Sequence, residues 1–319
     1  MTKPLSLIHD GDHGSDDVIA SLLLLANPDK INLLAITTQR GNVSAQIAAK
    51  NALRCLNMAK RTDIPVFIGS TKPFGQDVFP TGDDAFGDNG IGGVFLPEPK
   101  TQAQTLSALD FMIEALEKAD GKIHFALTGP CTNFAFLLKN RPDLKEKIGT
   151  VTIMGGCFEP QGPQGRRGNI TPYAEFNFFM DPEAADYVLA SGLDIVLFPM
   201  DLTHQLLFAE AQKEHLIKAC GDEKGEIFSD IMLAASHLDE KNFGVKGAFQ
   251  HDQQTALYFL DDTLFTYQSA AVEIVAEGEE RGRAKLSSIA HGKIRIASGL
   301  TSRNKNFEMV IDALKKMSL

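Results

Sequence analysis

The stretch LSLIHDGDHGSDDVIASLLLL, residues 5–25, decides the fold class. A short apolar run is followed by a loop that carries four aspartates, and residues 15–25 then show helical spacing of apolar side chains. The same alternation of short apolar runs and longer helical patterns continues through most of the chain. We therefore predict an α/β fold, with an open, mostly parallel, twisted sheet flanked by helices.

The elements of this fold are placed by their spacing. Strands are predicted at residues 5–9, 31–37, 64–68, 123–127, 150–154 and 193–198. Helices are predicted at residues 15–25, 45–58, 104–118 and 182–190. After about residue 208 we expect additional C-terminal helices within 210–241, 251–260 and 306–316, and strands at 270–276 and 293–297. We see no linker or repeat, so we expect one α/β domain over residues 1–319, with Gly-rich loops at 74–93 and 155–168 that cover a ligand.

Composition limits the function classes. The 319 residues carry a formal net charge of −10, and the lysines and arginines are scattered, so we expect no binding to a nucleic-acid polymer. Four widely spaced cysteines are typical of reduced thiols in a cytosolic protein. No run approaches the roughly 20 apolar residues of a membrane span, and the apolar stretch near the N-terminus is too short for a secretory signal. We therefore expect a cytoplasmic protein.

The clearest chemical feature is a cluster of four acidic residues. Asp10, Asp12, Asp16 and Asp17 lie directly after the first predicted strand, at the edge of the sheet where α/β proteins bind ligands. Four like charges repel each other, and the helix dipole offsets at most about 1 kcal/mol of that. A hard cation suits the site, and calcium takes about six to eight oxygen ligands. The alternative, an acidic turn that caps the helix, needs only one carboxylate.

At this point the sequence resembles the inosine-uridine preferring nucleoside hydrolase family, whose hallmark is an apolar strand followed by a DxDxGxDD loop. Further segments resemble family motifs, in family order, up to residue 252. They are GNVS (41–44) with NAL (51–53), TGPCTN (128–133), IMGG (153–156), GNITPYAEFNFFMDPEAA (168–185), DLTHQ (201–205) and the pair His251-Asp252. The resemblance implies a nucleoside hydrolase-like, Rossmann-related fold.

The resemblance also implies a reaction and the residues that perform it. It implies hydrolysis of the N-glycosidic bond of ribonucleosides, releasing free base and ribose, by a calcium-bound water that Asp12 activates as general base. The implied Ca²⁺ ligands are Asp12, Asp17, the main-chain carbonyl of Thr128, and Asp252, with Asp10 supporting them from behind. His251 matches a histidine near the leaving base. It is either the acid that protonates the base or a hydrogen-bond partner beside a metal ligand, and both alternatives stay open.

Six positions match family residues that surround the ribose. They are Asp16, Asn42, Met154, Asn169, Glu175 and Asn177. Carboxylates and amides of this kind pair with ribose hydroxyls, and such a site discriminates against an analogue that lacks a hydroxyl. The sequence therefore predicts a preference for ribosides over deoxyribosides.

The chain departs from the family near the base side of the pocket. Phe86 stands where the family often has histidine, and we expect it to bind substrate by stacking on the base. His13 replaces a usual proline and either reaches the pocket or caps the turn; we favour the cap. The loop at 157–168 is longer than usual and contains Arg166 and Arg167, and Gln253 stands where proline is common. These changes leave the preferred base open.

Two rival functions are weighed. Magnesium-dependent phosphohydrolases resembling the haloacid dehalogenase group also begin with a strand and a DxD, but they need Thr or Val where His13 and Gly14 follow here. The other rival is a non-catalytic nucleoside- or ribosyl-binding protein of the same fold. For the hydrolase, the resemblance implies a small-molecule ribonucleoside as the partner and a homodimer or homotetramer, and the lack of a long apolar run predicts no membrane partner.

Overall fold

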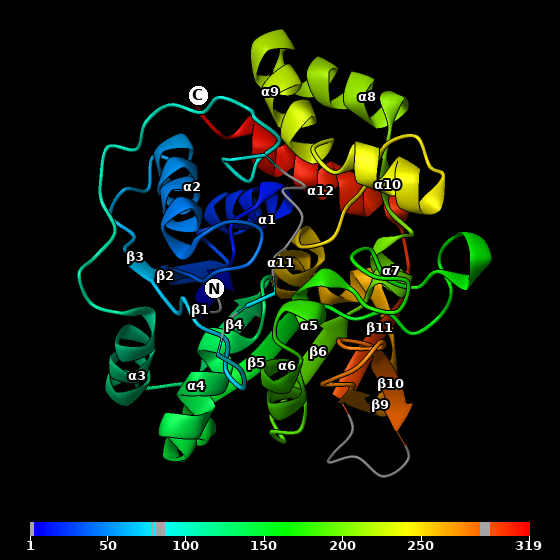
Figure 1. The fold of residues 1–319 in the computed structure, drawn as a ribbon. Coiled ribbons are helices and arrows are strands. Elements are labelled where there is room, and N and C mark those ends of the chain that lie inside the picture. Colours follow the sequence, from blue (N-terminus) through cyan, green and yellow to red (C-terminus); the bar gives the residue numbers. More distant parts are fainter. Residues whose placement is uncertain (1–2, 78, 81–86, 288–293) are drawn as a thin grey trace.

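A computed structural model describes residues 3–77, 79–80, 87–287 and 294–319. Its centre is a nine-stranded sheet in the order β10-β9-β11-β6-β5-β4-β1-β2-β3, covered by helices on both faces (Figure 1). From β11 to β3 neighbouring strands are parallel, while β9 and β10 at one edge run antiparallel to their neighbours. The strands are β1 (Leu5–Gly11), β2 (Ile31–Thr38), β3 (Val66–Ile68), β4 (Ile123–Leu127), β5 (Ile148–Met154), β6 (Ile195–Phe198), β9 (Phe265–Ile274), β10 (Ala284–Ser287) and β11 (Ile294–Leu300).

Helices connect most of these strands, and a separate antiparallel pair, β7 (Leu207–Phe208) and β8 (Ala248–Phe249), lies outside the main sheet. The helices are α1 (Ser15–Leu25), α2 (Ala45–Met58), α3 (Ala108–Lys118), α4 (Thr132–Asn140), α5 (Phe176–Met180), α6 (Pro182–Leu189), α7 (Met200–Thr203), α8 (Glu210–Cys220), α9 (Asp222–Met232), α10 (Ser236–Phe243), α11 (Gln253–Leu260) and α12 (Arg303–Lys315). Within the described ranges, none of them is long and apolar enough to cross a membrane.

Strand β1 contributes to two hydrophobic cores, one on each face of the sheet. Leu7 packs with residues of α1, α2, α9, α11 and α12, whereas Ile8 packs with residues of α3, α4 and α6. Neighbouring side chains of a strand point to opposite faces, and both of these are fully buried. This explains why β1 has apolar residues at the consecutive positions 7 and 8 instead of a strict alternation.

The order of the strands creates a crevice between β1 and β4. After β1 the chain builds β2 and β3 on one side, and then returns to build β4, β5 and β6 on the other. Asp10 of β1 is in register with Leu127 of β4, so the residues that follow both strands meet at one edge of the sheet. Ligands of open α/β sheets bind at such a reversal of strand order.

The predicted α/β class is confirmed, and the six predicted N-terminal strands overlap β1 to β6 with bounds that differ by at most two residues. The helix expected at 104–118 begins at Ala108, because the Ser107 side chain caps it by accepting a hydrogen bond from a main-chain amide. The helical region 210–241 is three helices, since Gly221 adopts a φ of 86° between α8 and α9. Strand β10 was not predicted. Residue 293 and residues 78 and 81–86 of the loop 74–93 lie outside the described residues.

We predict that Phe125→Ala lowers the free energy of unfolding by about 3–5 kcal/mol, because it leaves a cavity in a packed core. Phe125 of β4 is fully buried. Phe95→Ala is the control, since this ring is 80% exposed. Urea unfolding followed by circular dichroism measures both, and equal midpoints for the two variants would contradict the assignment of this core.

Candidate active site

Most of the predicted site residues lie in the crevice between β1 and β4 and beside the end of β5. Asp12 follows β1, Thr128 follows β4, and Met154 is the last residue of β5. Thr128 and Met154 line a cavity of about 300 Å³, together with Asp16, Asn42, Asn169, Glu175, Asn177, His251 and Asp252 among others, while Asp12 is fully buried and is not among the lining residues. The topology thus gathers residues from Ser15 to Asp252 around one cavity.

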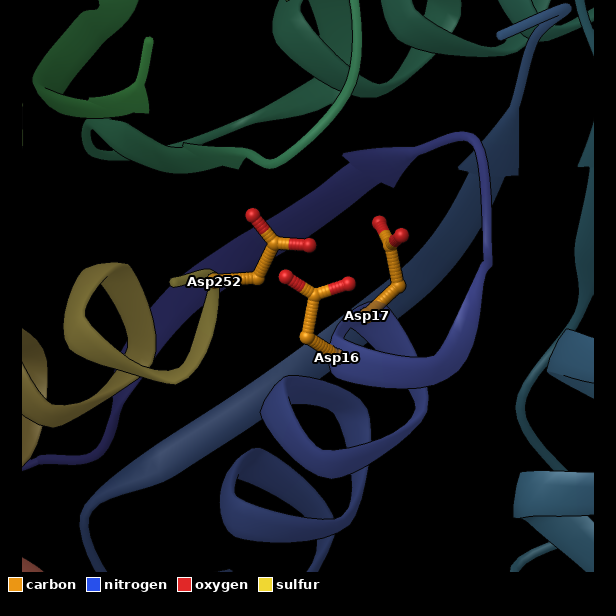
Figure 2. Close-up of side chains that lie close together, drawn as sticks. All are labelled: Asp16, Asp17 and Asp252. Carbon is orange, nitrogen blue, oxygen red and sulfur yellow. The ribbon is translucent and has the colours of Figure 1, made fainter. Parts of the chain in front are cut away.

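Three carboxylates converge at the base of α1 and α11. One oxygen each of Asp16, Asp17 and Asp252 lies within 4.8 Å of the others (Figure 2). Asp17 and Asp252 are buried, while Asp16 is half-buried and lines the cavity. Burial, together with the neighbouring negative charges, raises the pKa of both Asp17 and Asp252 well above the ordinary value. These three residues therefore form an electrostatically strained group.

Asp12 lies beside this group and has one oxygen without a protein partner. Its Oδ2 accepts a hydrogen bond from the Asn42 amide at 2.5 Å, whereas the buried Oδ1 has no hydrogen-bond partner among the described residues. Gly41 permits this approach, since a Cβ at that position would overlap the Asp12 carboxylate. Burial raises the pKa of Asp12 to about 7. An unpaired buried oxygen of this kind is uncommon and indicates a missing partner.

Asp10 lies behind the cavity and connects three elements. Its Oδ1 accepts hydrogen bonds from Thr37 Oγ1 at 2.6 Å and Asn133 Nδ2 at 2.8 Å. Its Oδ2 accepts one from Gln39 Nε2 at 3.2 Å. The side chain does not line the cavity. Asp10 therefore joins the end of β1 to β2 and α4, and so supports the loop that carries Asp12 from behind the cavity.

A buried chain of hydrogen bonds ends on Asp17. Thr128 Oγ1 donates to Asp17 Oδ1 at 2.5 Å and lies 2.8 Å from His9 Nε2. Ser21 Oγ lies 2.9 Å from His9 Nδ1 and 3.1 Å from His13 Nε2. Because the single Thr128 proton goes to Asp17, His9 Nε2 must donate to Thr128. Burial lowers the pKa of His9 and keeps it neutral, so its Nδ1 accepts the Ser21 proton, and Ser21 accepts from His13.

Glu175 and Asn177 form the floor of the cavity at the start of α5. Glu175 caps this helix by accepting the main-chain amides of Asn177 at 2.7 Å and Phe178 at 3.2 Å, and it also accepts the amide of Gly156 at 2.9 Å. Asn177 Nδ2 donates to the carbonyls of Thr128 and Met154, both at 3.1 Å. The ends of β4 and β5 are therefore held together by one amide side chain.

His251 lies on the cavity wall next to Asp252. Its Nδ1 is 2.7 Å from Thr203 Oγ1 at the end of α7, and burial lowers its pKa. Nearby, the His204 ring stacks on Phe249 with ring centroids 3.8 Å apart. Thr203 therefore fixes the orientation of the imidazole and leaves Nε2 as its other functional nitrogen.

The predictions for Phe86 and His13, the two residues expected near the base, have different outcomes. Phe86 lies outside the described residues. His13 is buried in a positive-φ turn, and its ring contacts Ser21 and does not line the cavity.

Several cavity residues were not predicted from the sequence as site residues. Arg166, Lys241 and Asn242 line one part of the cavity. Ile231, Met232, Ala235, Leu238 and Phe249 form an apolar wall. The residues of α9 and α10 have the spacing of ordinary amphipathic helices, so no local pattern distinguishes them. In the sequence, Arg166 differs from an ordinary surface arginine only by lying in the unusually long loop 157–168.

The donor set at the acidic group fits a hard divalent cation. All the side-chain atoms that converge here are carboxylate oxygens, and Thr128 lines the same cavity. Within the described ranges, no lysine or arginine forms an ion pair with Asp12, Asp16, Asp17 or Asp252. Unpaired buried carboxylates are costly, and oxygen ligands in this number suit calcium better than zinc.

Comparisons with known proteins agree with this geometry. The model of the inosine-uridine preferring nucleoside hydrolase family matches residues 7–316. The pyrimidine-specific ribonucleoside hydrolase RihA of Enterobacter sp. (strain 638) is 37% identical over 277 residues, which cover 86% of this chain and 85% of the relative. The enzyme of the same name from Escherichia coli O7:K1 is 36% identical over 277 residues, covering 86% of each chain.

Solved structures match over nearly the whole length. A plant nucleoside hydrolase superposes with a TM-score of 0.88 at 26% identity, covering 98% of this chain and 99% of the other. A purine-preferring ribonucleoside hydrolase from Gardnerella vaginalis gives a TM-score of 0.85 at 29% identity, with the same coverage. The arrangement of sheet and helices is therefore that of solved nucleoside hydrolases.

We predict that Ser21→Ala lowers the free energy of unfolding by about 1–3 kcal/mol for each nitrogen left unpaired, because both His9 Nδ1 and His13 Nε2 lose their partner. Ser6→Ala is the control, since the half-buried Ser6 hydroxyl has no hydrogen bond within the described part of β1 and its surroundings. Urea unfolding compares the two. Indistinguishable midpoints would show that the chain of hydrogen bonds contributes no stability.

Proposed function

The chain belongs to the inosine-uridine preferring nucleoside hydrolase family and is therefore a hydrolase of N-glycosyl bonds; from this premise we propose that it cleaves ribonucleosides by a calcium-dependent mechanism in which Asp12 is the general base. The products are the free base and ribose. The observation that carries the proposal is the convergence of Asp16, Asp17 and Asp252 beside the unpaired oxygen of Asp12.

Asp12, Asp17, the Thr128 carbonyl and Asp252 would hold the ion. When bound, calcium supplies the positive charge that compensates these groups, lowers the pKa of a water molecule in the site and attracts ribose hydroxyls. The hydrogen bond from Thr128 Oγ1 to Asp17 keeps that carboxylate in one orientation. A preoriented donor set loses less conformational entropy on binding an ion.

Asp12 prepares the nucleophile. Asn42 holds its Oδ2, which leaves Oδ1 to accept the proton of the attacking water. The water oxygen forms a bond to the anomeric carbon while the bond from that carbon to the base nitrogen breaks. Since the ribosyl group becomes positively charged along this path, the surrounding carboxylates stabilise the transition state electrostatically.

The ribose would lie against the half-buried and buried polar groups of the cavity floor. Asp16 and Glu175 accept hydrogen bonds from hydroxyl groups, and the amides Asn42, Asn169 and Asn177 offer both donors and acceptors. Met154 contributes an apolar surface at the end of β5. Groups of this kind remain unpaired when a hydroxyl is absent, so the site selects ribose.

His251 would assist the departure of the base. In the protonated imidazole Nδ1–H donates to Thr203 Oγ1 and Nε2 carries the second proton. That Nε2 proton can be donated to the base nitrogen as the glycosidic bond breaks, which leaves a neutral imidazole. Thr203 thereby acts as a positioning residue for His251.

The apolar wall of the cavity, on and beside α9, α10 and β8, is the part that would contact the base. RihA is named as pyrimidine-specific, whereas the Gardnerella enzyme is named as purine-preferring. The side chains of the wall here are Ile231, Met232, Ala235, Leu238 and Phe249. They offer few hydrogen-bond groups, so we propose that the wall selects a base by its shape and aromatic surface.

We predict that Asp12→Asn lowers kcat by about 10²–10⁴, the usual contribution of a general base, and that a chelator abolishes base release in the wild-type protein. A panel of ribonucleosides is incubated with calcium or with chelator, and free base is measured by chromatography. The control is Asp29→Asn, because Asp29 is exposed and remote from the cavity.

Base release that persists at the wild-type rate in Asp12→Asn would exclude this residue as the base. Calcium binding without release from any ribonucleoside would favour a non-catalytic binding protein. Release that survives complete chelation would contradict the metal requirement.

We predict that the 2′-deoxy counterpart of the preferred ribonucleoside has a kcat/KM lower by about 10⁴, because groups that pair with the 2′-hydroxyl are left unpaired. The same chromatographic assay measures both substrates with calcium present. Comparable values for the two substrates would contradict the assignment of Asp16 and its neighbours to the ribose hydroxyls.

A further inference from the structure

The cavity is lined by side chains of opposite charge. The carboxylates Asp16, Glu175 and Asp252 line it together with the basic residues Arg166 and Lys241. An unmodified ribonucleoside is neutral and gives the two cations no role. The protein has a formal net charge of −10, so two basic side chains in the substrate cavity call for an explanation.

The backbone fixes Arg166 at the end of the loop 157–168. Its carbonyl accepts the amides of Gln161 at 2.8 Å and Gly162 at 2.9 Å, and its own amide donates to the Pro163 carbonyl at 3.1 Å. These three hydrogen bonds close a tight turn. The arginine is therefore held at the rim of the cavity by local structure.

The Arg166 guanidinium is hydrogen-bonded to a residue proposed to contact the ribose. Arg166 Nη2 donates to the Asn169 carbonyl at 3.1 Å, and Asn242 Nδ2 donates to the same oxygen at 2.9 Å. Asn169 is one of the residues proposed to surround the ribose, whereas His251 lies near the base. The cation is thus directed to the sugar end of a bound substrate.

The positive charge of Arg166 has no counter-charge in the described part of the chain. No carboxylate there lies within ion-pair distance of it, although Arg54, Arg61, Arg141 and Arg295 each pair with at least one. Its buried Nε also lacks a hydrogen-bond partner within the same ranges, and burial lowers its pKa. A partly buried guanidinium with free N–H groups is complementary to phosphate, which accepts paired hydrogen bonds from it.

We propose that Arg166, assisted by Lys241, binds a phosphate group on the ribose of the substrate, so that the enzyme accepts ribonucleoside monophosphates. The inference rests on the proposed hydrolase function and specifies its substrate class. The reaction stays balanced: water bonds to the anomeric carbon, the bond to the base breaks, and the base gains a proton. The phosphate remains on the sugar, and the products are free base and ribose phosphate.

The test compares kcat/KM for the preferred ribonucleoside and for its 5′-monophosphate, in the wild type and in Arg166→Gln. We expect the wild type to prefer the monophosphate, and Arg166→Gln to lose about 10- to 100-fold with the monophosphate alone, since hydrogen bonds to charged groups contribute this much. Arg166→Lys should retain part of the preference because it keeps the charge. Arg303→Gln, an exposed change on α12 with the same change in net charge, should leave both values unaltered.

A wild-type preference for the unphosphorylated nucleoside would overturn the proposal. So would an equal loss with both substrates in Arg166→Gln, which would assign Arg166 to supporting Asn169. Orotidine, which carries its negative charge on the base, is compared with uridine. If Arg166→Gln lowered kcat/KM for orotidine as much as for the monophosphate, the assignment of Arg166 to the sugar would be wrong.

A binding measurement separates this inference from the proposed hydrolase function. Thermal unfolding is followed with ribose 5-phosphate, with ribose and without ligand, in the presence of calcium. We expect ribose 5-phosphate to raise the Tm more than ribose does, and Arg166→Gln to remove the difference. The hydrolase proposal fails if no nucleoside or nucleotide is cleaved, while the phosphate site fails if the two ligands act equally.

Discussion

The structure depends on holding several carboxylates together at the reversal of strand order between β1 and β4. Two unit charges 4 Å apart repel by about 4 kcal/mol at an effective dielectric constant of 20, and Asp17 and Asp252 are buried where water screens little. The carboxylates do not assemble by attraction for one another. The strand ends and the first turns of α1 and α11 bring them together, and hydrogen bonds from Asn42 and Thr128 hold Asp12 and Asp17 in place. Much of the surrounding polar structure, from Thr37 to Thr128, serves this purpose.

Two amide side chains make the floor of the site rigid. Asn133 donates both to Asp10 and to the Thr38 carbonyl, and so connects the ends of β1 and β2. Asn177 does the same for the ends of β4 and β5. Each asparagine thus joins two neighbouring strands near their carboxyl ends. Catalytic groups that are held by such contacts need little rearrangement when a substrate binds.

The fold and the acidic group were predictable from the sequence because both depend on local patterns. Residues 5–25 contain a strand, a loop and a helix in direct succession, and the four aspartates lie within that stretch. Contacts across the chain were not predictable. The pairing of Thr203 with His251, the chain from His13 to Thr128, and the position of Asn242 beside Asn169 all depend on which loops the strand order brings together. Helices were predicted within 210–241, but the position of the break at Gly221 was not, because a single glycine inside a helical pattern leaves the apolar spacing intact.

Strand β1 has a consequence for how the molecule loses its structure. Leu7 anchors one hydrophobic layer and Ile8 the other, and the same strand leads into the loop that carries Asp12. Neither layer can detach without releasing β1. Partly unfolded forms that keep an intact site are therefore disfavoured, and loss of the site coincides with cooperative melting of both layers. In such a molecule the disappearance of turnover during denaturation reports the global transition, not a local loosening.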